Sequence, residues 1–457
     1  MKIPPQAENI IKRLEAGGFT GWLVGGCVRD SLMGQQPHDW DVCTSARPEE
    51  VQSLFSGLTV IPTGLKHGTV TVMAEAAGLP ERIPVEITTY RKESAYSDGR
   101  RPDRVEFVND IEEDLARRDF TVNAMAWNPE KGLMDPFGGQ QDLEKGILRC
   151  VGHAHSRFEE DALRIIRALR FMSQKGFKAE ADTEKAIRQD YSLLERISAE
   201  RISSEFVKFL CGQGAAELLD DYREVFCFII PELKAMIGFD QRSPYHNRDV
   251  WQHSLCAVED IPPEPVLRMT MLLHDVAKPV VFILDDNGRG RFVGHPAKGA
   301  EMAETILRRM KYSNDFIKQV TTLIRYHDLK IRPEKPDVRR WLGRLGKETF
   351  DLLMYVRHAD ASGKYPQYLG EAEKKNQALK ELEDEIEAAG DCVDLKGLAV
   401  SGSQVTALGI SGSDTGSALD WLLEEVITER TPNDSEKLLE ALKKKLSRAG
   451  GEGSAFI

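Results

Sequence analysis

The sequence predicts an α/β head followed by an all-α remainder. An apolar strand ends in a glycine pair before a short helix near residue 25, and alternating, strand-like segments follow at 39–42 and 85–88. From about residue 157 onward, apolar residues recur at helical spacing instead. We therefore expect a head with a mixed sheet and helices over residues 1–148, and helices in the rest of the chain.

The composition fits a protein of several domains that works in water. The chain has 457 residues, of which 41% are hydrophobic and 29% charged. No apolar run approaches the roughly 18 residues of a membrane span, and the N-terminus lacks the apolar core of a signal peptide. Seven scattered cysteines form no Cys-x-x-Cys pair, which argues against a zinc ribbon and a disulfide framework. We expect a cytoplasmic protein that does not contact a membrane.

The first feature that suggests chemistry is the pair Gly25-Gly26 at the end of the strand predicted over 22–24. Without Cβ atoms, this backbone can bring its N–H groups close to a triphosphate, and the helix predicted over 28–33 favours an anion at its N-terminus. Arg29 lies in the first turn of that helix. Alone, such a pair is more often a tight turn from strand to helix.

Two aspartates, Asp39 and Asp41, follow about a dozen residues later. Because the segment alternates as a strand does, both carboxylates leave one face and can share one or two Mg²⁺ ions. Two such ions, roughly 3.5–4 Å apart, can activate an attacking hydroxyl and stabilise a leaving pyrophosphate. Glu86 is the candidate third acid. Alone, Asp-x-Asp is more often a polar strand edge, but with the upstream glycines and Arg29 it indicates nucleotidyl transfer, with Asp39 and Asp41 as catalytic residues.

A second arginine suits the same phosphates. Arg118, in the run 117–119, offers planar bidentate donors that match phosphate oxygens. We expect it to bind the triphosphate together with the glycine turn and Arg29. Asp119 and Asn123 are expected to organise the site.

Four ordered blocks carry a resemblance to a known family. They are LVGGCVRDSLMGQQPHDWDVCTSA at 23–46, RRDFTVNAMA at 117–126, DPFGG at 135–139 and EDALRIIRALRF at 160–171. In these blocks the sequence resembles the class II tRNA nucleotidyltransferases (CCA-adding enzymes) and the bacterial poly(A) polymerases of the polymerase β superfamily. The resemblance implies a polymerase β-like head that uses Mg²⁺, with tRNA, CTP and ATP as its partners.

The last block predicts a helix with a polar stripe. Ser156 and Glu159 form a capping box, so residues from about 157 onward should be helical. Positions 161, 164, 167 and 170 then lie on one slowly turning stripe, away from the apolar positions. The alternative is an ordinary solvated face of i,i+3 salt bridges.

The chemistry of this stripe favours two of the four bases. Asp161 offers only acceptors and Arg164 only donors. Cytosine and adenine present an amine donor beside a ring-nitrogen acceptor, whereas uracil and guanine present the reverse. A mismatched base would leave buried polar groups unpaired, at about 1–3 kcal/mol each. The resemblance gives this template role to Asp161 and Arg164, with Arg167 and Arg170 contacting nucleotide or holding the pair.

The segment 90–105 is polar and broken by glycine, which predicts a mobile loop. In the resembled family such a loop accompanies the addition of the terminal adenine and is shortened in enzymes that add only the two cytidines. Its presence here favours full CCA addition or adenine addition.

RNA binding by this chain needs a local basic stripe, because the net charge is −12. Four runs of cations could form one, and each could equally be a plain solvated face. They are Arg164 to Arg170, Arg308-Arg309, Arg339-Arg340 and Lys443-Lys444-Lys445.

A second constellation lies downstream, where histidines and acids recur on successive predicted helices. Imidazoles and carboxylates in this pattern suit a divalent metal within a helical bundle. The segment resembles the HD phosphohydrolase superfamily, whose metal pattern matches His253, His274, Asp275 and Asp360. His295 and His327 could extend the site toward a second metal.

This HD-like segment could act in one of two ways. Many polymerases of the resembled family carry a related helical segment without hydrolase activity. An active segment would use Ni²⁺, Co²⁺ or Mn²⁺ to hydrolyse a 2′,3′-cyclic phosphodiester or a 2′-phosphate at an RNA end. A single histidine on a helix is more often a core residue than a ligand, but six of the ten histidines fall within one segment.

These landmarks predict four parts. They are the nucleotidyltransferase head at 1–148, a helical neck with the template at 149–212, a helical body at 213–370 with the HD-like domain at about 245–365, and a helical tRNA-binding tail at 371–457. The expected activity is Mg²⁺-dependent, template-free addition of C, C and A to the tRNA 3′ end. The alternatives are an adenine-only enzyme or poly(A) polymerase and, from another class, an RNA-end phosphohydrolase with a nucleotide-binding head.

Overall fold

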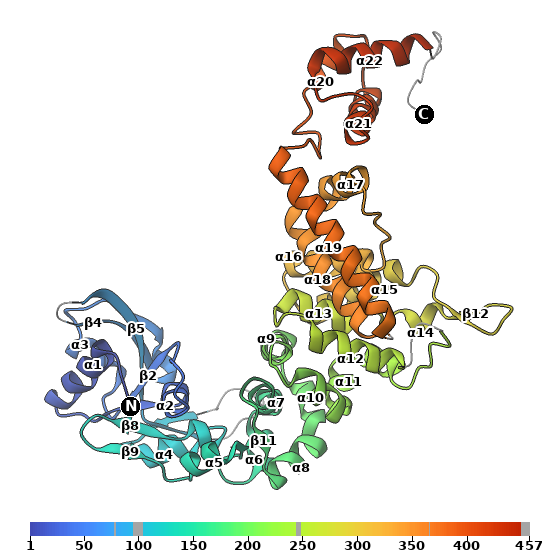
Figure 1. Cartoon of the computed structure of the whole chain (residues 1–457). Helices are drawn as coiled ribbons and strands as arrows, with labels where there is room; N and C mark the ends of the chain where they lie inside the picture. The colour runs from blue at the N-terminus through green and yellow to red at the C-terminus, as the bar shows by residue number, and fades with distance from the viewer. Residues whose placement is uncertain (77–78, 95–103, 244–247, 365, 449–457) are drawn as a thin grey trace. The chain divides into compact units, whose positions relative to one another are not determined.

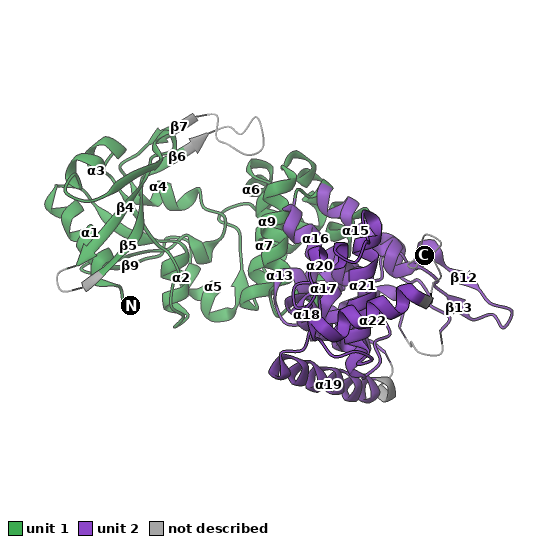
Figure 2. Cartoon of the chain, turned by 90° about the horizontal axis from the view of Figure 1, so that it is seen from above, with its two compact units in different colours: residues 1–231, 309–311 green, residues 232–308, 312–457 purple. Residues whose placement is uncertain are grey.

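The computed structural model describes residues 1–76, 79–94, 104–243, 248–364 and 366–448. The chain forms two compact units, coloured separately in Figure 2. Unit 1 comprises Met1–Pro231 with Arg309–Lys311, and unit 2 comprises Glu232–Arg308 with Tyr312–Ile457.

The head of unit 1 is built on a mixed sheet of seven strands, in the order β3-β4-β5-β2-β1-β8-β9 (Figure 1). The strands are β1 (Gly21–Val24), β2 (Trp40–Thr44), β3 (Val60–Gly64), β4 (Thr69–Ala76), β5 (Leu79–Thr89), β8 (Ala126–Asn128) and β9 (Gly132–Met134). Strands β2 and β5 pair in parallel, and the other neighbours in this sheet pair antiparallel. The predicted α/β head with a mixed sheet is confirmed.

Helices cover both faces of the head sheet because its strands alternate apolar residues between them. One face packs Leu23, Val42 and Ile87 against α1 (Pro5–Ala16) and α3 (Pro48–Leu54). The other face packs Trp22 and Cys43 against α4 (Ile111–Ala116). Polar side chains that share this second face of β2 and β5 therefore lie on the α4 side.

The rest of unit 1 is helical, with two short ribbons. The remaining helices are α2 (Gly26–Leu32), α5 (Gly139–Lys145), α6 (Ala154–Glu160), α7 (Leu163–Lys175), α8 (Ala181–Asp190), α9 (Ala199–Leu210), α10 (Ala215–Asp221) and α11 (Arg223–Ile229), with 3₁₀ turns η1 (Leu65–His67), η2 (Thr121–Asn123) and η3 (Tyr191–Arg196). The ribbons are β6 (Arg91–Ser94) with β7 (Arg104–Phe107), antiparallel, and β10 (Ile147–Leu148) with β11 (Lys178–Ala179), parallel.

Within its described residues, unit 2 is helical apart from one short hairpin. Its elements are α12 (Val250–Asp260), α13 (Pro265–Leu273), α14 (Lys278–Val281), β12 (Ile283–Leu284), β13 (Gly290–Arg291), α15 (His295–Arg309), α16 (Asn314–Tyr326), α17 (Lys335–Leu345), α18 (Lys347–Ser362), α19 (Pro366–Ala389), α20 (Gly402–Thr406), α21 (Ser413–Ile427) and α22 (Ser435–Arg448), and η4 (Pro231–Met236) spans the unit boundary. Helices α12, α13, α16 and α18 pack against one another. A separate apolar core lies among α20, α21 and α22. The predicted boundaries at 148/149 and 212/213 fall inside unit 1, and α19 runs across the one at 370/371.

Two local predictions are wrong. The capping box does not start the template helix, because α6 begins at Ala154, three residues before the predicted start, and its N-cap is His153. The helix is also not continuous, because the backbone at Asp161 is extended (φ −144°, ψ 100°) and α7 begins only at Leu163.

The segment 90–105, predicted to be a loop, contains strand residues at both of its described ends. Residues 91–94 and 104–107 pair as strands β6 and β7. The central run Ser97 to Pro102 of that prediction lies outside the described residues.

Candidate active site and histidine cluster

Asp41 and Glu86 meet on the parallel strand pair of the head. They are direct register partners on β2 and β5. Both side chains face the α4 side of the sheet. Asp41 alternates in phase with Cys43, which packs against α4, and Glu86 lies between Val85 and Ile87, which pack on the opposite face. Asp39 lies two residues before Asp41, just outside the strand, and is exposed.

The electrostatics of Asp41 show that the three predicted acids influence one another. Burial, Glu86 and Asp39 raise the pKa of Asp41 to about 6, and Arg118 acts in the opposite direction. The three carboxylates are not among the sets of described ligand atoms that lie within 4.8 Å of one another. The cluster is therefore negatively charged and more open than a closed metal cage.

The glycine turn places Arg118 beside these acids. Gly25 has a φ of 73°, which favours glycine, and a Cβ at this position would lie 3.0 Å from Nη1 of Arg118. Arg118 Nη2 donates to Asp114 over 3.3 Å, while its buried Nε has no hydrogen-bond partner in the described structure. The backbone of Gly25 and the guanidinium of Arg118 thus share one small space.

A buried polar network continues from Arg29 toward α7. Arg29, 7% exposed, donates from Nη1 to Asn123 over 2.5 Å and pairs with Asp30. Asn123 donates to Asp119 over 3.0 Å, and Arg167 donates to Asp119 over 2.6 Å. Burial would raise the pKa of Asp119, but Arg167 and Asn123 hold it well below its usual range. Asp119 and Asn123 thus connect the turn after β1 to α7.

The two predicted template residues do not lie on one continuous helix. Arg164 lies on α7, 8% exposed, and donates to Glu160 over 2.7 Å and to the Arg117 carbonyl over 3.1 Å. Asp161 lies in the break between α6 and α7, where its carboxylate accepts from Arg201 of α9 over 2.7 Å. The two side chains are neighbours across a bend rather than on one helical stripe.

The other stripe positions are held by ion pairs. Arg170 pairs with Glu205 of α9 over 3.1 Å, and Arg167 pairs with Asp119. The run at 339–340 is also paired: Arg339 contacts Asp391 and Glu429, and Arg340 contacts Glu424 and Asp337. Two of the predicted basic runs contain exposed cations: Lys443 and Lys444 in one, and Arg308 and Arg309 in the other, where Arg308 pairs with Glu304.

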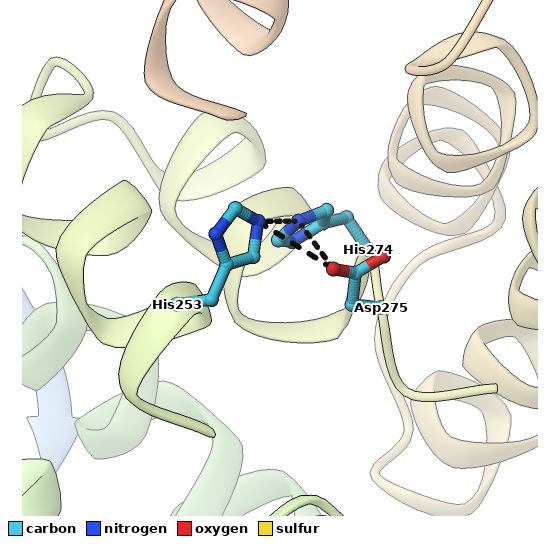
Figure 3. A group of neighbouring side chains, drawn as sticks. All are labelled: His253, His274 and Asp275. Carbon is cyan, nitrogen blue, oxygen red and sulfur yellow. Dashed lines mark hydrogen bonds and ion pairs between the residues drawn. The ribbon is translucent and has the colours of Figure 1, made fainter. Parts of the chain in front are cut away.

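The predicted histidine and aspartate residues of unit 2 converge from several helices. Figure 3 shows His253, His274 and Asp275 pointing toward one another. The Nε2 atoms of the two histidines lie 3.3 Å apart, and those of His253 and His274 lie 3.5 and 3.2 Å from Asp275 Oδ2. Asp360 Oδ1 lies 3.1 Å from His253 Nε2.

A second set shares Asp275. His295 and His327 bring their Nε2 atoms within 3.2 Å of each other, 3.5 and 3.8 Å from Asp275 Oδ1. The described ligand atoms thus form two sets within 4.8 Å, which are His253, His274 and Asp275, and Asp275, His295 and His327. One carboxylate lies between two pairs of imidazoles, so the arrangement can hold one or two metal ions.

The backbone orients three of these rings. The Nδ1 atoms of His274, His295 and His327 each lie 2.6–2.9 Å from the carbonyl oxygen three residues earlier. An Nδ1–H donor there leaves the Nε2 lone pair directed into the cluster, as in metal-ligating histidines. Burial lowers the pKa of His327 to about 3, which favours its neutral form. Without a metal ion, Asp275 and Asp360 overcome burial and raise the pKa of His274 to about 9, so a metal ion bound there would displace the proton on Nε2.

Three family models match successive parts of the chain. The "Poly A polymerase head domain" matches residues 21–149, the "Probable RNA and SrmB- binding site of polymerase A" matches 176–237, and "tRNA nucleotidyltransferase domain 2 putative" matches 296–442. The chain belongs to the tRNA nucleotidyltransferase and poly(A) polymerase family. The third match includes His327 and Asp360, so part of the histidine cluster lies in a segment typical of this family.

Individual relatives of this nucleotidyltransferase-family chain agree with that assignment. A CCA-adding enzyme of Ligilactobacillus salivarius is 44% identical over 254 residues, 54% of this chain and 61% of the relative. One of Leuconostoc mesenteroides is 48% identical over 214 residues, 47% of this chain and 51% of the relative. The chain thus spans about half to three fifths of the length of these curated relatives.

Solved structures extend the likeness along the chain. The CCA-adding enzyme of Bacillus stearothermophilus, in complex with CTP, matches with a TM-score of 0.73 and 29% identity, over 98% of this chain and 99% of that one. The Thermotoga maritima CCA-adding enzyme, complexed with tRNA, shares the fold at a TM-score of 0.57 and 20% identity, over 97% and 96%. No helix within the described ranges is both long and apolar enough to cross a membrane.

Sequence reasoning missed three residues that pair with side chains of the candidate nucleotide site: Asp114, Arg201 and Glu205. Asp114 is fully buried and lies beside Ile111 and Leu115 on the apolar side of α4. A charge on the buried face of an amphipathic helix was the available signal. Arg201 and Glu205 gave no such signal, because their partners, Asp161 before α7 and Arg170 on α7, are distant in sequence.

Proposed function

We propose that this protein is a CCA-adding tRNA nucleotidyltransferase, which adds C, C and A to the tRNA 3′ end from CTP and ATP without a nucleic-acid template. The observation that carries this proposal is the register pairing of Asp41 with Glu86, beside Asp39 and the Gly25–Arg118 turn. The relatives named CCA-adding enzymes support it. The proposed site of action is the cytoplasm.

Asp39 and Asp41, with Glu86, are the proposed metal ligands. The residues fit a divalent cation, because burial and mutual repulsion raise the pKa of Asp41 and a cation would relieve both. Bound there, Mg²⁺ would supply the charge stabilisation that an in-line displacement at the α-phosphate needs. In the proposed reaction the tRNA 3′-hydroxyl attacks the α-phosphorus and pyrophosphate leaves.

The turn after β1 is the proposed triphosphate site. Gly25 and Gly26 bring backbone close to the phosphates, and Arg118 offers the buried Nε donor that has no partner within the described chain. Arg29 stands beside the same turn, tied to Asn123 and Asp30, and holds its shape while contributing positive charge.

Asp161 and Arg164 are the proposed base-selecting pair. Asp161 would accept a hydrogen bond from the exocyclic amine of C or A, and Arg164 would donate to the ring nitrogen. The bidentate contact from Arg201 fixes the Asp161 carboxylate at 2.7–3.3 Å, so Arg201 orients the acceptor. Arg167 and Arg170 hold this region through Asp119 and Glu205.

Stepwise nucleotide addition tests the proposal. A tRNA that ends before its CCA is incubated with CTP alone, ATP alone or both, and the extended RNA is sized. We expect two additions with CTP alone and a third only when both are present. Addition of ATP without CTP would identify an adenine-only enzyme or poly(A) polymerase instead.

The histidine cluster supports a second candidate function, metal-dependent phosphate hydrolysis at an RNA end. Four buried imidazoles surround the buried carboxylate of Asp275, and Asp360 contacts two of them, His253 and His274. Phosphate release from 2′-phosphate and 2′,3′-cyclic phosphate RNA, with added Ni²⁺, Co²⁺ or Mn²⁺, tests this function in the wild type and His274→Ala. An Asp39→Ala variant that keeps this hydrolysis would show that the two activities are separate, and no metal-dependent release by the wild type would exclude hydrolysis.

A further inference from the structure

We propose that Asp114 is a positioning residue that joins the β6–β7 ribbon to Arg118, so that triphosphate binding and the anchoring of the ribbon are coupled. This inference rests on the proposed nucleotidyltransferase function, in which Arg118 contacts the triphosphate. It concerns a residue that reaches neither the reacting atoms nor the base.

Asp114 connects two parts of the head that are separate in sequence and in secondary structure. One carboxylate oxygen accepts from the amide of Arg91, the first residue of β6, over 3.2 Å. The other accepts from Nη2 of Arg118 over 3.3 Å. The same carboxylate takes two donors of Arg117, at 2.8 and 3.0 Å. One side chain thus binds the base of the ribbon and the guanidinium beside Gly25.

Burial makes this connection difficult to replace by water. The Asp114 side chain is fully buried, whereas those of Arg117 and Arg118 are 17% and 19% exposed. A buried carboxylate needs its charged partners, so a shift of either guanidinium changes the hydrogen bonding of the whole group. The Arg91 amide is part of that group.

The ribbon base is also joined to the strands that carry the acids. The amide of Tyr90 donates to the Thr44 carbonyl at the end of β2, and the amide of Val108 donates to Tyr90. Glu86 lies on β5, and the ribbon begins at Arg91, five residues after Glu86. Asp114 therefore lies where the ribbon, the acidic strands and the Arg118 guanidinium come together.

Coupling of this kind acts in both directions. A triphosphate that engages Arg118 should hold Asp114 in place and stabilise the Arg91 end of the ribbon. A ribbon held at Arg91 should in turn keep Arg118 positioned for the phosphates. Cytidine monophosphate, which lacks the β- and γ-phosphates, should have less of this effect.

The test compares Asp114→Asn with two other variants of the full-length chain. Asparagine keeps an acceptor for the Arg91 amide but loses the charge that holds Arg118. Asp110→Asn is the matched control, because Asp110 belongs to the same helix as its N-cap and accepts from the Glu112 amide. Arg118→Gln removes the guanidinium that Asp114 binds. It replaces Asp114→Asn in the test if Asp114→Asn does not fold.

The measurements are CTP and CMP affinity by calorimetry, and the rate of tryptic cleavage after Arg91, Lys92 and Arg104 with and without saturating CTP. In the wild type we expect CTP to slow this cleavage several-fold. In Asp114→Asn we expect CTP affinity to fall about tenfold, CMP affinity to change little, and the protection to disappear even at saturating CTP. Asp110→Asn should behave as the wild type.

Two results would overturn the inference. The first is that Asp114→Asn binds CTP as tightly as the wild type. The second is that saturating CTP still protects Asp114→Asn or Arg118→Gln from cleavage. If the wild type binds CTP and shows the protection but adds no nucleotide to tRNA, the proposed function fails while the coupling stands. If addition is normal but CTP gives no protection, the coupling fails alone.

Discussion

Asp41 on β2 and Glu86 on β5 are register partners in a parallel strand pair, and their carboxylates share the face of the sheet on which α4 packs. The backbone register, rather than a flexible side chain, sets their spacing. A metal site built in this way depends on the sheet staying intact.

Replacing the third acid should weaken metal use without destroying the site. We expect Glu86→Gln to lower the rate of CMP addition about 10–100-fold at low Mg²⁺, with partial recovery at high Mg²⁺, because one coordinating or neighbouring charge is lost. The measurement is single-turnover addition across a Mg²⁺ titration. Glu81→Gln is the control, because Glu81 is also exposed on β5 but its side chain leaves the opposite face of the strand. Equal rates for wild type and Glu86→Gln at every Mg²⁺ concentration would remove Glu86 from the site.

Removing the Asp41 charge should stabilise the metal-free protein. The pKa of Asp41 is about 6 when folded, above its value in an unfolded chain, so ionisation lowers the free energy of unfolding as pH rises from about 4 to 6. We expect Asp41→Asn to raise Tm in EDTA at pH 8 by roughly 2–4 °C while abolishing nucleotide addition. The gain should shrink toward pH 4, where the wild-type carboxyl is protonated. A gain that does not depend on pH would contradict this origin.

The glycine turn should tolerate no side chain beside Arg118. Gly25→Ala introduces both a strained backbone (φ 73°, ψ −128°) and a contact with Arg118, whereas Gly34→Ala introduces a positive φ (71°) in open space. We expect each to cost at least about 1–2 kcal/mol of stability, and only Gly25→Ala to raise the KM for CTP. Thermal melts and steady-state kinetics separate the two effects. An equal rise in KM for both variants would mean that the effect on CTP does not depend on the contact between residue 25 and Arg118.

Changing the base-selecting pair should relax nucleotide choice. Asp161→Ala and Arg164→Ala remove groups that match C and A, at about 1–3 kcal/mol per unpaired partner. We expect misincorporation of UMP or GMP to rise at least several-fold in each, measured by supplying single nucleotides. Glu159→Gln, at an exposed position of α6, is the control. Unchanged selectivity in both alanine variants would refute the assignment.

The histidine cluster should bind metal through buried imidazoles. We expect the wild type to retain one or two equivalents of Ni²⁺, Co²⁺ or Mn²⁺ after dialysis, and His274→Ala to lose most of this, because His274 contacts both Asp275 and Asp360. Elemental analysis gives the stoichiometry. His358→Ala is a control on the same helix as Asp360, since His358 is 42% exposed. Metal-free wild type after loading would exclude the site.

The sequence predicted the head because its signals are local. Alternation along β2 and β5 and the glycine pair after β1 depend on neighbouring residues, and the structure has these elements where they were expected. The break at Asp161 could not be predicted in the same way. No glycine or proline marks residues 160–162, and the Asp161 side chain at the break accepts from Arg201, forty residues away.

The histidine cluster could be predicted from the sequence only in part. Its residue types were visible in the sequence, but the sharing of Asp275 between two histidine pairs depends on how separate helices pack. The same holds for Asp114, whose partners on β6 and after α4 become neighbours only in the folded head.

The break between α6 and α7 gives the two halves of the proposed base reader different mechanical properties. Arg164 belongs to a helix and is buried, so its donors are fixed, while the Asp161 carboxylate belongs to a bend and is held by another side chain. A pyrimidine and a purine place the same hydrogen-bonding pattern at different distances from the sugar. The donor depends on α7 and the acceptor on Arg201 of α9, so bases of two widths would be read by a pair of residues whose spacing is set by two packed helices.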